Sequence, residues 1–129
     1  MTRILVIEDE RQIREVLKQV LLKANFEVET AANGIEGLQK FRSAPADLVI
    51  TDILMPEKDG LETIEELTRE FKELPIIAIS GGGPGARAQY ALDLAEQYGA
   101  VWILAKPFSR KDILAAIEEA LPAQPATSP

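Results

Sequence analysis

Three carboxylates, a hydroxyl and an ammonium group stand after short apolar runs of this sequence. Glu8 and Asp9 follow the first run, Asp52 follows the third, and Ser80 and Lys106 follow the fourth and fifth. Carboxylates that share one place repel each other unless a cation holds them, and their oxygens suit Mg²⁺ better than they suit soft metals. These residue types predict a magnesium site, provided that the fold brings them together.

The apolar runs are predicted to be strands of a parallel sheet, because longer amphipathic stretches separate them. Four runs, at 4–7, 48–50, 76–79 and 101–105, lack alternation, as expected for strands covered by helices on both faces. The remaining run, 26–30, alternates and predicts an edge strand. In a parallel α/β sheet, the loops after the carboxyl ends of the strands meet at one edge, where ligands bind. We therefore expect an α/β fold with the polar residues gathered at that edge.

Apolar spacing and end signals predict five helices around this sheet. The first carries a buried stripe at three-four spacing, formed by Ile13, Val16, Leu17, Val20 and Leu21. The second opens with Asn33 and Glu36 at the spacing of a capping box, and the last opens with Ser109. The third is predicted around residues 61–71, and the fourth, with the least regular pattern, after Pro84.

Length and composition predict one folded domain and exclude several kinds of chemistry. The chain has 129 residues, of which we assign 1–121 to the domain and 122–129, with its prolines and no charge, to a flexible tail. With no cysteine and no histidine, it cannot form a disulfide, a thiol nucleophile, an imidazole base or the usual zinc site. A net charge of −7 disfavours direct binding to nucleic acid.

The start of the chain does not have the pattern of a signal peptide. Its first apolar run has only four residues, 4–7, and three acidic residues follow at once. No apolar run approaches the length of a membrane span, so we expect a cytoplasmic protein without membrane contact.

Each polar residue also has a purely structural interpretation. Asp9 could cap a helix that has Gln12 at its third position, Ser80 could be a turn hydroxyl, and Lys106 could be an exposed charge. Asp52 is harder to explain in this way because it lies within an apolar stretch, and a buried acid needs partners.

Taken together, the order and placement of these residues match a known family. The motifs are Glu8-Asp9, Asp52 with Met55-Pro56 and Asp59-Gly60 downstream, Ser80, and Lys106-Pro107-Phe108. With these motifs, the chain resembles the receiver domain of two-component response regulators from about Thr2 to Leu121. The resemblance implies a doubly wound, five-stranded parallel sheet flanked by five helices, with the flavodoxin-like strand order 2-1-3-4-5.

The resemblance also implies a role for each site residue. Asp52 would be the phosphoacceptor, attacking phosphorus as a carboxylate nucleophile. Lys106 would pair with Asp52 at rest and with phosphoryl oxygens afterwards, and Ser80 would donate its hydroxyl to the phosphoryl group. The bond before Pro107 would be cis. The implied Mg²⁺ ligands are Asp9, Asp52, the backbone carbonyl of Leu54 and, through a water molecule, Glu8.

The implied function is signalling rather than the turnover of another substrate. Such a receiver catalyses only its own phosphorylation and dephosphorylation, and takes the phosphoryl group from a sensor histidine kinase or a histidine phosphotransferase. The signal would leave through an unidentified downstream protein, because we expect no output domain after the tail, or the phosphoryl group would pass along a phosphorelay.

Two departures from the family concern the switching step. Most receivers carry an aromatic residue three positions before the lysine, where this chain has Ile103. The segment after Ser80 is rich in glycine, with Gly81-Gly82-Gly83-Pro84-Gly85. The usual aromatic switch is therefore absent from this sequence.

Three other functions remain open at the level of sequence. The first is a receiver-like interaction module that does not use phosphorylation, although the retained acidic and basic residues argue against it. The second is a phosphatase of the haloacid dehalogenase type, but its nucleophile follows the first strand and another aspartate stands two positions on, where this chain has Leu54. The third is a flavodoxin-like nucleotide or flavin binder, which would need a phosphate loop after the first strand.

Overall fold

The fold is described by a computed structural model for residues 1–53, 60–71, 73–80, 93, 97 and 102–121. This part of the chain forms five strands and four helices. In chain order they are β1 (Arg3–Ile7), α1 (Arg11–Lys23), β2 (Glu27–Ala31), α2 (Gly34–Ser43), β3 (Leu48–Asp52), α3 (Gly60–Glu70), β4 (Ile76–Ser80), β5 (Trp102–Ala105) and α5 (Arg110–Ala120). The helix predicted after Pro84, the glycine-rich segment and the predicted tail lie outside the described residues.

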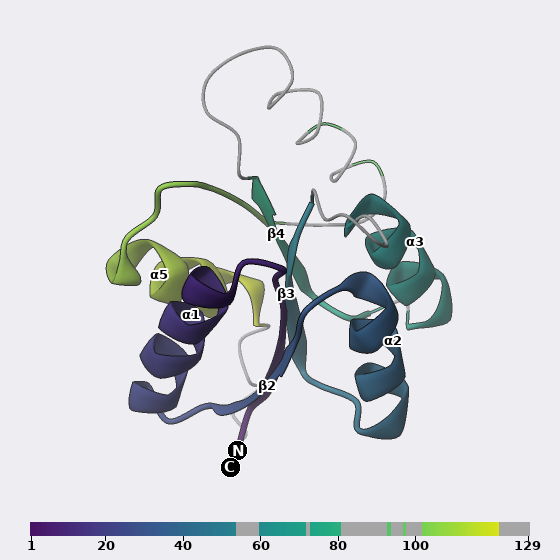
Figure 1. The fold of residues 1–129 in the computed structure, drawn as a ribbon, viewed down its shortest axis with the longest axis horizontal. Helices are drawn as coiled ribbons and strands as arrows, with labels where there is room; N and C mark the ends of the chain where they lie inside the picture. The colour runs from purple at the N-terminus through teal and green to yellow at the C-terminus, as the bar shows by residue number, and fades with distance from the viewer. Residues whose placement is uncertain (54–59, 72, 81–92, 94–96, 98–101, 122–129) are drawn as a thin grey trace.

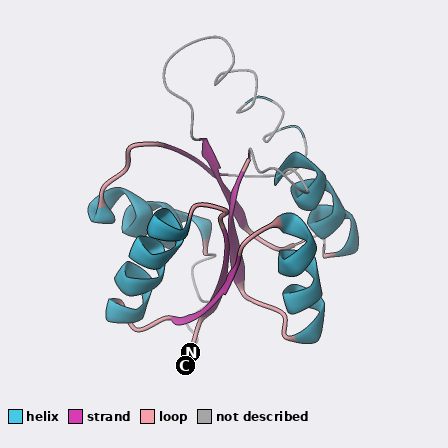
Figure 2. Cartoon of the chain, viewed as in Figure 1, coloured by secondary structure: helices cyan, strands magenta, loops and turns pink. Residues whose placement is uncertain are grey.

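The five strands form one parallel sheet in the order β2-β1-β3-β4-β5, which confirms the predicted order. Figure 2 shows these strands as a central layer between helices. The register sets the carboxyl ends of neighbouring strands beside one another, because Ile7 pairs with Thr51 and Ser80 pairs with Ala105. Residues that follow these strands therefore emerge at a common edge, which we call the carboxyl edge.

Helices cover both faces of the sheet, as predicted for a doubly wound fold. α1 and α5 lie on one side and α2 and α3 on the other (Figure 1). Strand β1 supplies both cores, because Leu5 and Ile7 belong to the cluster under α2 and α3 while Ile4 and Val6 belong to the cluster under α1 and α5. All four side chains are at most 2% exposed. Unbroken apolar strands thus reflect burial on two sides.

Strand β2 is the edge strand that its alternating sequence predicted. Its residues are exposed or half-buried except for Ala31 at its end. Ion pairs border it, with Arg3 Nη1 2.8 Å from Glu27 Oε2 and Lys40 Nζ 3.0 Å from Glu29 Oε2. Lys40 Nζ also lies 3.0 Å from Glu36 Oε2 on its own helix. Charged side chains therefore occupy this border of the sheet.

The predicted helix starts have the expected polar contacts. The Asn33 side chain accepts a hydrogen bond from the Glu36 N–H at 2.8 Å, and Glu36 Oε1 accepts one from the Ala32 N–H at 2.7 Å. At α5, Ser109 and Asp112 form a complete capping box. The Asn33 and Ser109 side chains thus accept from N–H groups of the first helical turn, which have no partner within the helix. Glu36 instead bonds the N–H of Ala32, the residue before the N-cap.

The prediction that Val16 is buried is wrong. Leu17 and Leu21 are at most 1% exposed, whereas Val16 is 59% exposed. Val16 lies at the margin of the apolar stripe, on the side that lines a groove together with Lys106. Helical spacing alone therefore placed one exposed residue, Val16, in the predicted buried stripe.

Helix α2 packs so closely on β1 that Gly37 has no room for a side chain. A Cβ atom at Gly37 would lie 2.8 Å from Ile7 Cγ1 and closer still to Ile7 Cδ1. Ile7 is fully buried, so it cannot swing into solvent to make space.

We expect Gly37→Ala to lower the free energy of unfolding by about 1 to 3 kcal/mol, the usual effect of overpacking a core, even though alanine favours helices. Urea denaturation measures this change. Gln39→Ala, on the exposed side of the same helix, is the control and should change stability by less than about 0.5 kcal/mol. In an Ile7→Val background, the loss caused by Gly37→Ala should shrink, because the overlapping Cδ1 methyl group is gone; an undiminished loss contradicts the overlap.

Candidate functional site

The acidic residues predicted to meet do so at the carboxyl edge. Glu8 comes directly after β1, and Asp52 is the last residue of the neighbouring strand β3. Together with Asp9, they offer carboxylate oxygens that all lie within 4.8 Å of one another. Strand order creates this cluster, because β1 and β3 are adjacent in space although they are far apart in the sequence.

Two of these carboxyl groups are almost completely buried. Glu8 is 0% exposed and Asp52 is 3% exposed. Glu8 Oε2 accepts a hydrogen bond of 3.1 Å from the Glu10 N–H, while Glu8 Oε1 has no hydrogen-bond partner among the described residues. A buried carboxylate oxygen without a hydrogen bond is costly, which makes this part of the site receptive to a positively charged group.

Lys106 supplies positive charge to the cluster from the loop after β5. Its Nζ lies 3.1 Å from Asp52 Oδ2 and 3.6 Å from Glu8 Oε1, and its side chain is 17% exposed. Burial works against the charged form of Lys106, but its hydrogen bond to Asp52 and the charges of Asp52 and Glu8 outweigh burial and raise its pKa. Lys106 therefore stays an ammonium ion. The Lys106–Pro107 peptide bond is cis.

Glu8 has an unusual protonation behaviour in the absence of a cation. Burial, and then the nearby negative charge of Asp52, raise the pKa of Glu8 to about 8, although the Glu10 N–H and Lys106 act in the opposite direction. Glu8 is therefore protonated at neutral pH when no cation is bound, chiefly because it is buried.

The arrangement fits a hard divalent cation such as Mg²⁺. Glu8, Asp9 and Asp52 present oxygen ligands from three side chains, and one Glu8 oxygen lacks a hydrogen-bond partner among the described residues. Mg²⁺ prefers such oxygens and is held by a few carboxylates. Asp9 is not the helix cap that a structural interpretation allowed, because the N-cap of α1 is Glu10.

Two residues near the site were not identified from sequence. Glu10 Oε1 lies 3.4 Å from Lys106 Nζ, and Arg14 Nη1 donates a 2.8 Å hydrogen bond to the Glu8 carbonyl. The run Glu8-Asp9-Glu10 offered a signal for Glu10. Its contact with Lys106, however, joins positions that only the folded sheet brings together.

The other predicted residues are placed only in part. Ser80 ends β4 beside Ala105, the residue before Lys106, while its hydroxyl and the Leu54 carbonyl lie outside the described part of the structure. Trp102 and Phe108 pack against the core under α1 and α5. Ile103, which takes the place of the aromatic switch, packs against the opposite core.

Comparison with known proteins identifies relatives over almost the whole chain. The family model of the response regulator receiver domain matches residues 4–118. The chain is 33% identical over 121 residues to a Haemophilus influenzae homolog of the transcriptional regulatory protein CpxR, covering 94% of this chain and 51% of that protein. It is 34% identical over 119 residues to the probable C4-dicarboxylate response regulator DctR of Bacillus subtilis, covering 91% and 51%. The chain thus spans about half the length of these curated relatives.

Solved structures show the same fold. A CheY-like response regulator receiver domain protein from Methanospirillum hungatei superposes with a TM-score of 0.86 at 29% identity, covering 94% of both chains. The response regulator TrrA from Thermotoga maritima, in complex with Mg²⁺-BeF, superposes with a TM-score of 0.83 at 37% identity, covering 94% of this chain and 100% of that one.

The buried Glu8 carboxyl predicts how stability depends on pH when no cation is present. The folded chain keeps a proton on Glu8 up to about pH 8, whereas an ordinary glutamate in the unfolded chain loses it near pH 4.5. The folded state binds more protons between these values, so in EDTA the free energy of unfolding should fall as pH rises through this window. Chemical denaturation at a series of pH values measures the fall.

Glu8→Gln should make this fall smaller, because glutamine does not titrate. Glu15→Gln, on the exposed surface of α1, is the matched control and should keep the wild-type trend. A fall of the same size in Glu8→Gln would assign the effect to another group.

Proposed function

Because the chain belongs to the response regulator receiver domain family, we propose that Asp52 accepts a phosphoryl group in a reaction that requires Mg²⁺. One observation carries this proposal: Asp52 lies buried at the carboxyl edge, with an ammonium group 3.1 Å from its Oδ2 and two further carboxylates close by. This is the combination of nucleophile and positive charge that phosphoryl transfer needs.

The reaction with a small donor such as acetyl phosphate is a simple displacement. An Asp52 carboxylate oxygen forms a bond to phosphorus, the bond between phosphorus and the acetate oxygen breaks, and acetate leaves with the electron pair. Lys106, which pairs with Asp52 before the reaction, would contact phosphoryl oxygens as negative charge develops on them. Water would later cleave the aspartyl phosphate, so the protein catalyses only its own phosphorylation and dephosphorylation.

We propose the remaining site roles by analogy with the family. Glu8, Asp9, Asp52 and the Leu54 backbone carbonyl would hold Mg²⁺, with Glu8 acting through a water molecule. When bound, Mg²⁺ supplies positive charge to the phosphoryl oxygens. The hydroxyl of Ser80 would donate a hydrogen bond to the phosphoryl group. The gathered carboxylates of Glu8, Asp9 and Asp52 support the metal assignment.

We further propose that a sensor histidine kinase or a histidine phosphotransferase supplies the phosphoryl group and that the receiver domain, residues 1–121, signals to a downstream protein. The curated relatives are regulators about twice as long as this chain, so the output of the whole protein is part of the proposal. A net charge of −7 supports signalling without direct contact between this domain and nucleic acid. None of the described helices is long and apolar enough to span a bilayer, and a cytoplasmic location stays a prediction from sequence.

Acetyl phosphate and Mg²⁺ should add one phosphoryl group to the wild-type chain, as read by intact mass. Asp52→Asn should abolish the gain because an amide is not a nucleophile, and EDTA should suppress it. Asp9→Asn should slow it by weakening the metal site. A phosphoryl mass on Asp52→Asn would refute the site, and an unlabelled wild type would leave the interaction module that does not use phosphorylation as the better reading.

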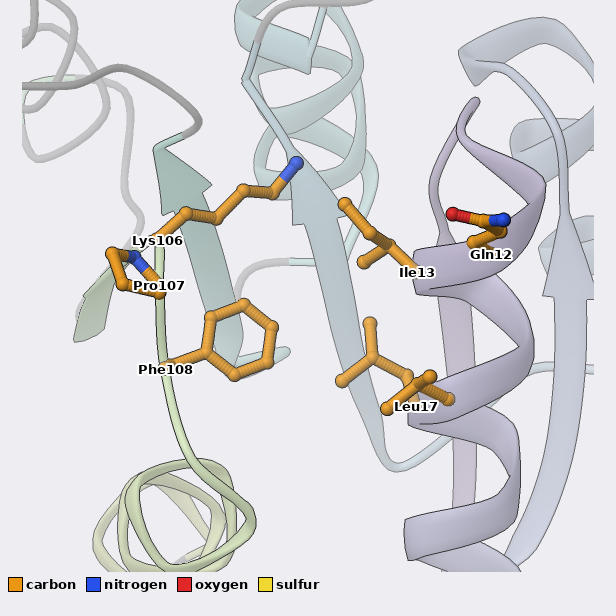
Figure 3. A pocket seen from close by; sticks show the side chains of 7 residues that line it. Gln12, Ile13, Leu17, Lys106, Pro107 and Phe108 are labelled. Atoms are coloured by element: carbon orange, nitrogen blue, oxygen red, sulfur yellow. The ribbon is translucent and has the colours of Figure 1, made fainter.

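A protein donor needs a place to dock, and an apolar groove lies next to the site. This groove, of about 630 Å³, is lined by Gln12, Ile13, Val16, Leu17, Lys106, Pro107 and Phe108. Figure 3 shows Lys106 and Phe108 facing Ile13 and Leu17 of α1 across it. Lys106 both lines the groove and contacts Asp52, so a protein seated there would have its phosphohistidine close to the nucleophile. The exposed Val16 offers such a protein an apolar contact.

We expect Val16→Gln to slow phosphoryl transfer from a phosphorylated histidine phosphotransferase about fivefold to tenfold, the effect of losing one good apolar contact at an interface. Labelling by acetyl phosphate tests whether the chemistry itself is intact and should keep its wild-type rate. Leu22→Gln, another exposed apolar residue of α1 that does not line the groove, is the control for both donors. Equal slowing by the two variants, or no slowing by either, would exclude the groove as the docking site.

A further inference from the structure

Lys106 contacts a third carboxylate besides those of Asp52 and Glu8. Glu10 Oε1 lies 3.4 Å from Lys106 Nζ, a distance between the 3.1 Å to Asp52 Oδ2 and the 3.6 Å to Glu8 Oε1. The Glu10 side chain is 63% exposed, whereas that of Asp52 is 4% exposed and that of Glu8 is fully buried. Glu10 therefore holds the ammonium group from the solvent side of the site, while the other two hold it from the buried side.

The backbone fixes Glu10 in a position from which its side chain can reach Lys106. Glu10 is the N-cap residue of α1, its N–H donates to Glu8 Oε2, and its carbonyl accepts from the Arg14 N–H at 2.9 Å. The Glu10 side chain makes no capping hydrogen bond. Short side chains such as serine or aspartate suit capping better than glutamate does. The Glu10 carboxylate instead spans from the start of α1 to the loop after β5.

The contact with Glu10 would compete with the proposed contact between Lys106 and the phosphoryl oxygens. The ammonium group has three N–H donors, and each one that points to Glu10 is not available to a phosphoryl oxygen. Glu10 is not one of the three carboxylates that gather at the candidate metal site, yet it contacts the same ammonium group as two of them.

We propose that Glu10 is a positioning residue that restrains Lys106 and thereby slows the phosphorylation of Asp52. The inference rests on the proposed function and adds a residue that lowers the rate of phosphorylation. The chemical step is the displacement described above, in which the bond from Asp52 to phosphorus forms as the bond to the leaving acetate breaks. Glu10 takes no part in either bond and acts only through Lys106.

Glu10→Gln removes the charge that holds Lys106 while keeping the length of the side chain. With Mg²⁺ and acetyl phosphate, we expect the full chain to be labelled about twofold to fivefold faster than wild type, the factor that corresponds to an exposed ion pair. Intact mass over time gives the rate. The affinity for beryllofluoride, measured by calorimetry in Mg²⁺, should rise by a similar factor. Glu15→Gln makes the same charge change on the exposed surface of α1 and should leave both quantities at their wild-type values.

A second donor separates restraint of Lys106 from simple repulsion of an anion. Phosphoramidate carries less negative charge than acetyl phosphate, so release of Lys106 should speed labelling by both donors to the same degree. A gain confined to acetyl phosphate overturns the positioning role, and so does an unchanged or slower rate in Glu10→Gln. Failure of the wild-type chain to gain a phosphoryl group would instead refute the proposed function itself.

Discussion

Repulsion among carboxylates that the sheet forces together is the constraint on which the site depends. Strand β1 lies beside β3, and Ile7 pairs with Thr51, so the residues that follow, Glu8 and Asp52, are buried side by side. When no cation is bound, a proton on Glu8 and the ammonium group of Lys106 relieve this repulsion at neutral pH.

Two helices, α1 and α5, begin next to the charged residues of the site. Helix α1 begins directly after the acidic run, and α5 begins shortly after Lys106, so both helices are anchored at the carboxyl edge. Both also pack against the same core, under one face of the sheet. The ion pair between Lys106 and Asp52 thus joins two parts of the chain whose relative position the core already fixes. A rigid scaffold of this kind keeps opposite charges in contact with little reorganisation when a reaction occurs.

Sequence patterns predicted the parts of the structure that depend on local signals. Unbroken apolar runs identified the buried strands, alternation identified β2, and cap residues such as Ser109 identified helix starts. The meeting of Glu8, Asp9 and Asp52 could be predicted because strand ends of a parallel sheet share one edge. The contact between Glu10 and Lys106 could not, since it depends on how a side chain crosses from α1 to a loop 96 positions away. Exposure of Val16 was missed for a similar reason, because helical spacing gives the direction of a face but not its width.

The ion pairs along β2 affect how two molecules of this protein meet at high concentration. A strand at the border of a sheet presents N–H and C=O groups to which a strand of another molecule can add. A strand added at β2 would lie beside Glu27 and Glu29 and their cationic partners Arg3 and Lys40. Desolvating those charges is costly. The border of the sheet at β2 therefore opposes strand addition, the step by which folded proteins join into growing β-rich aggregates.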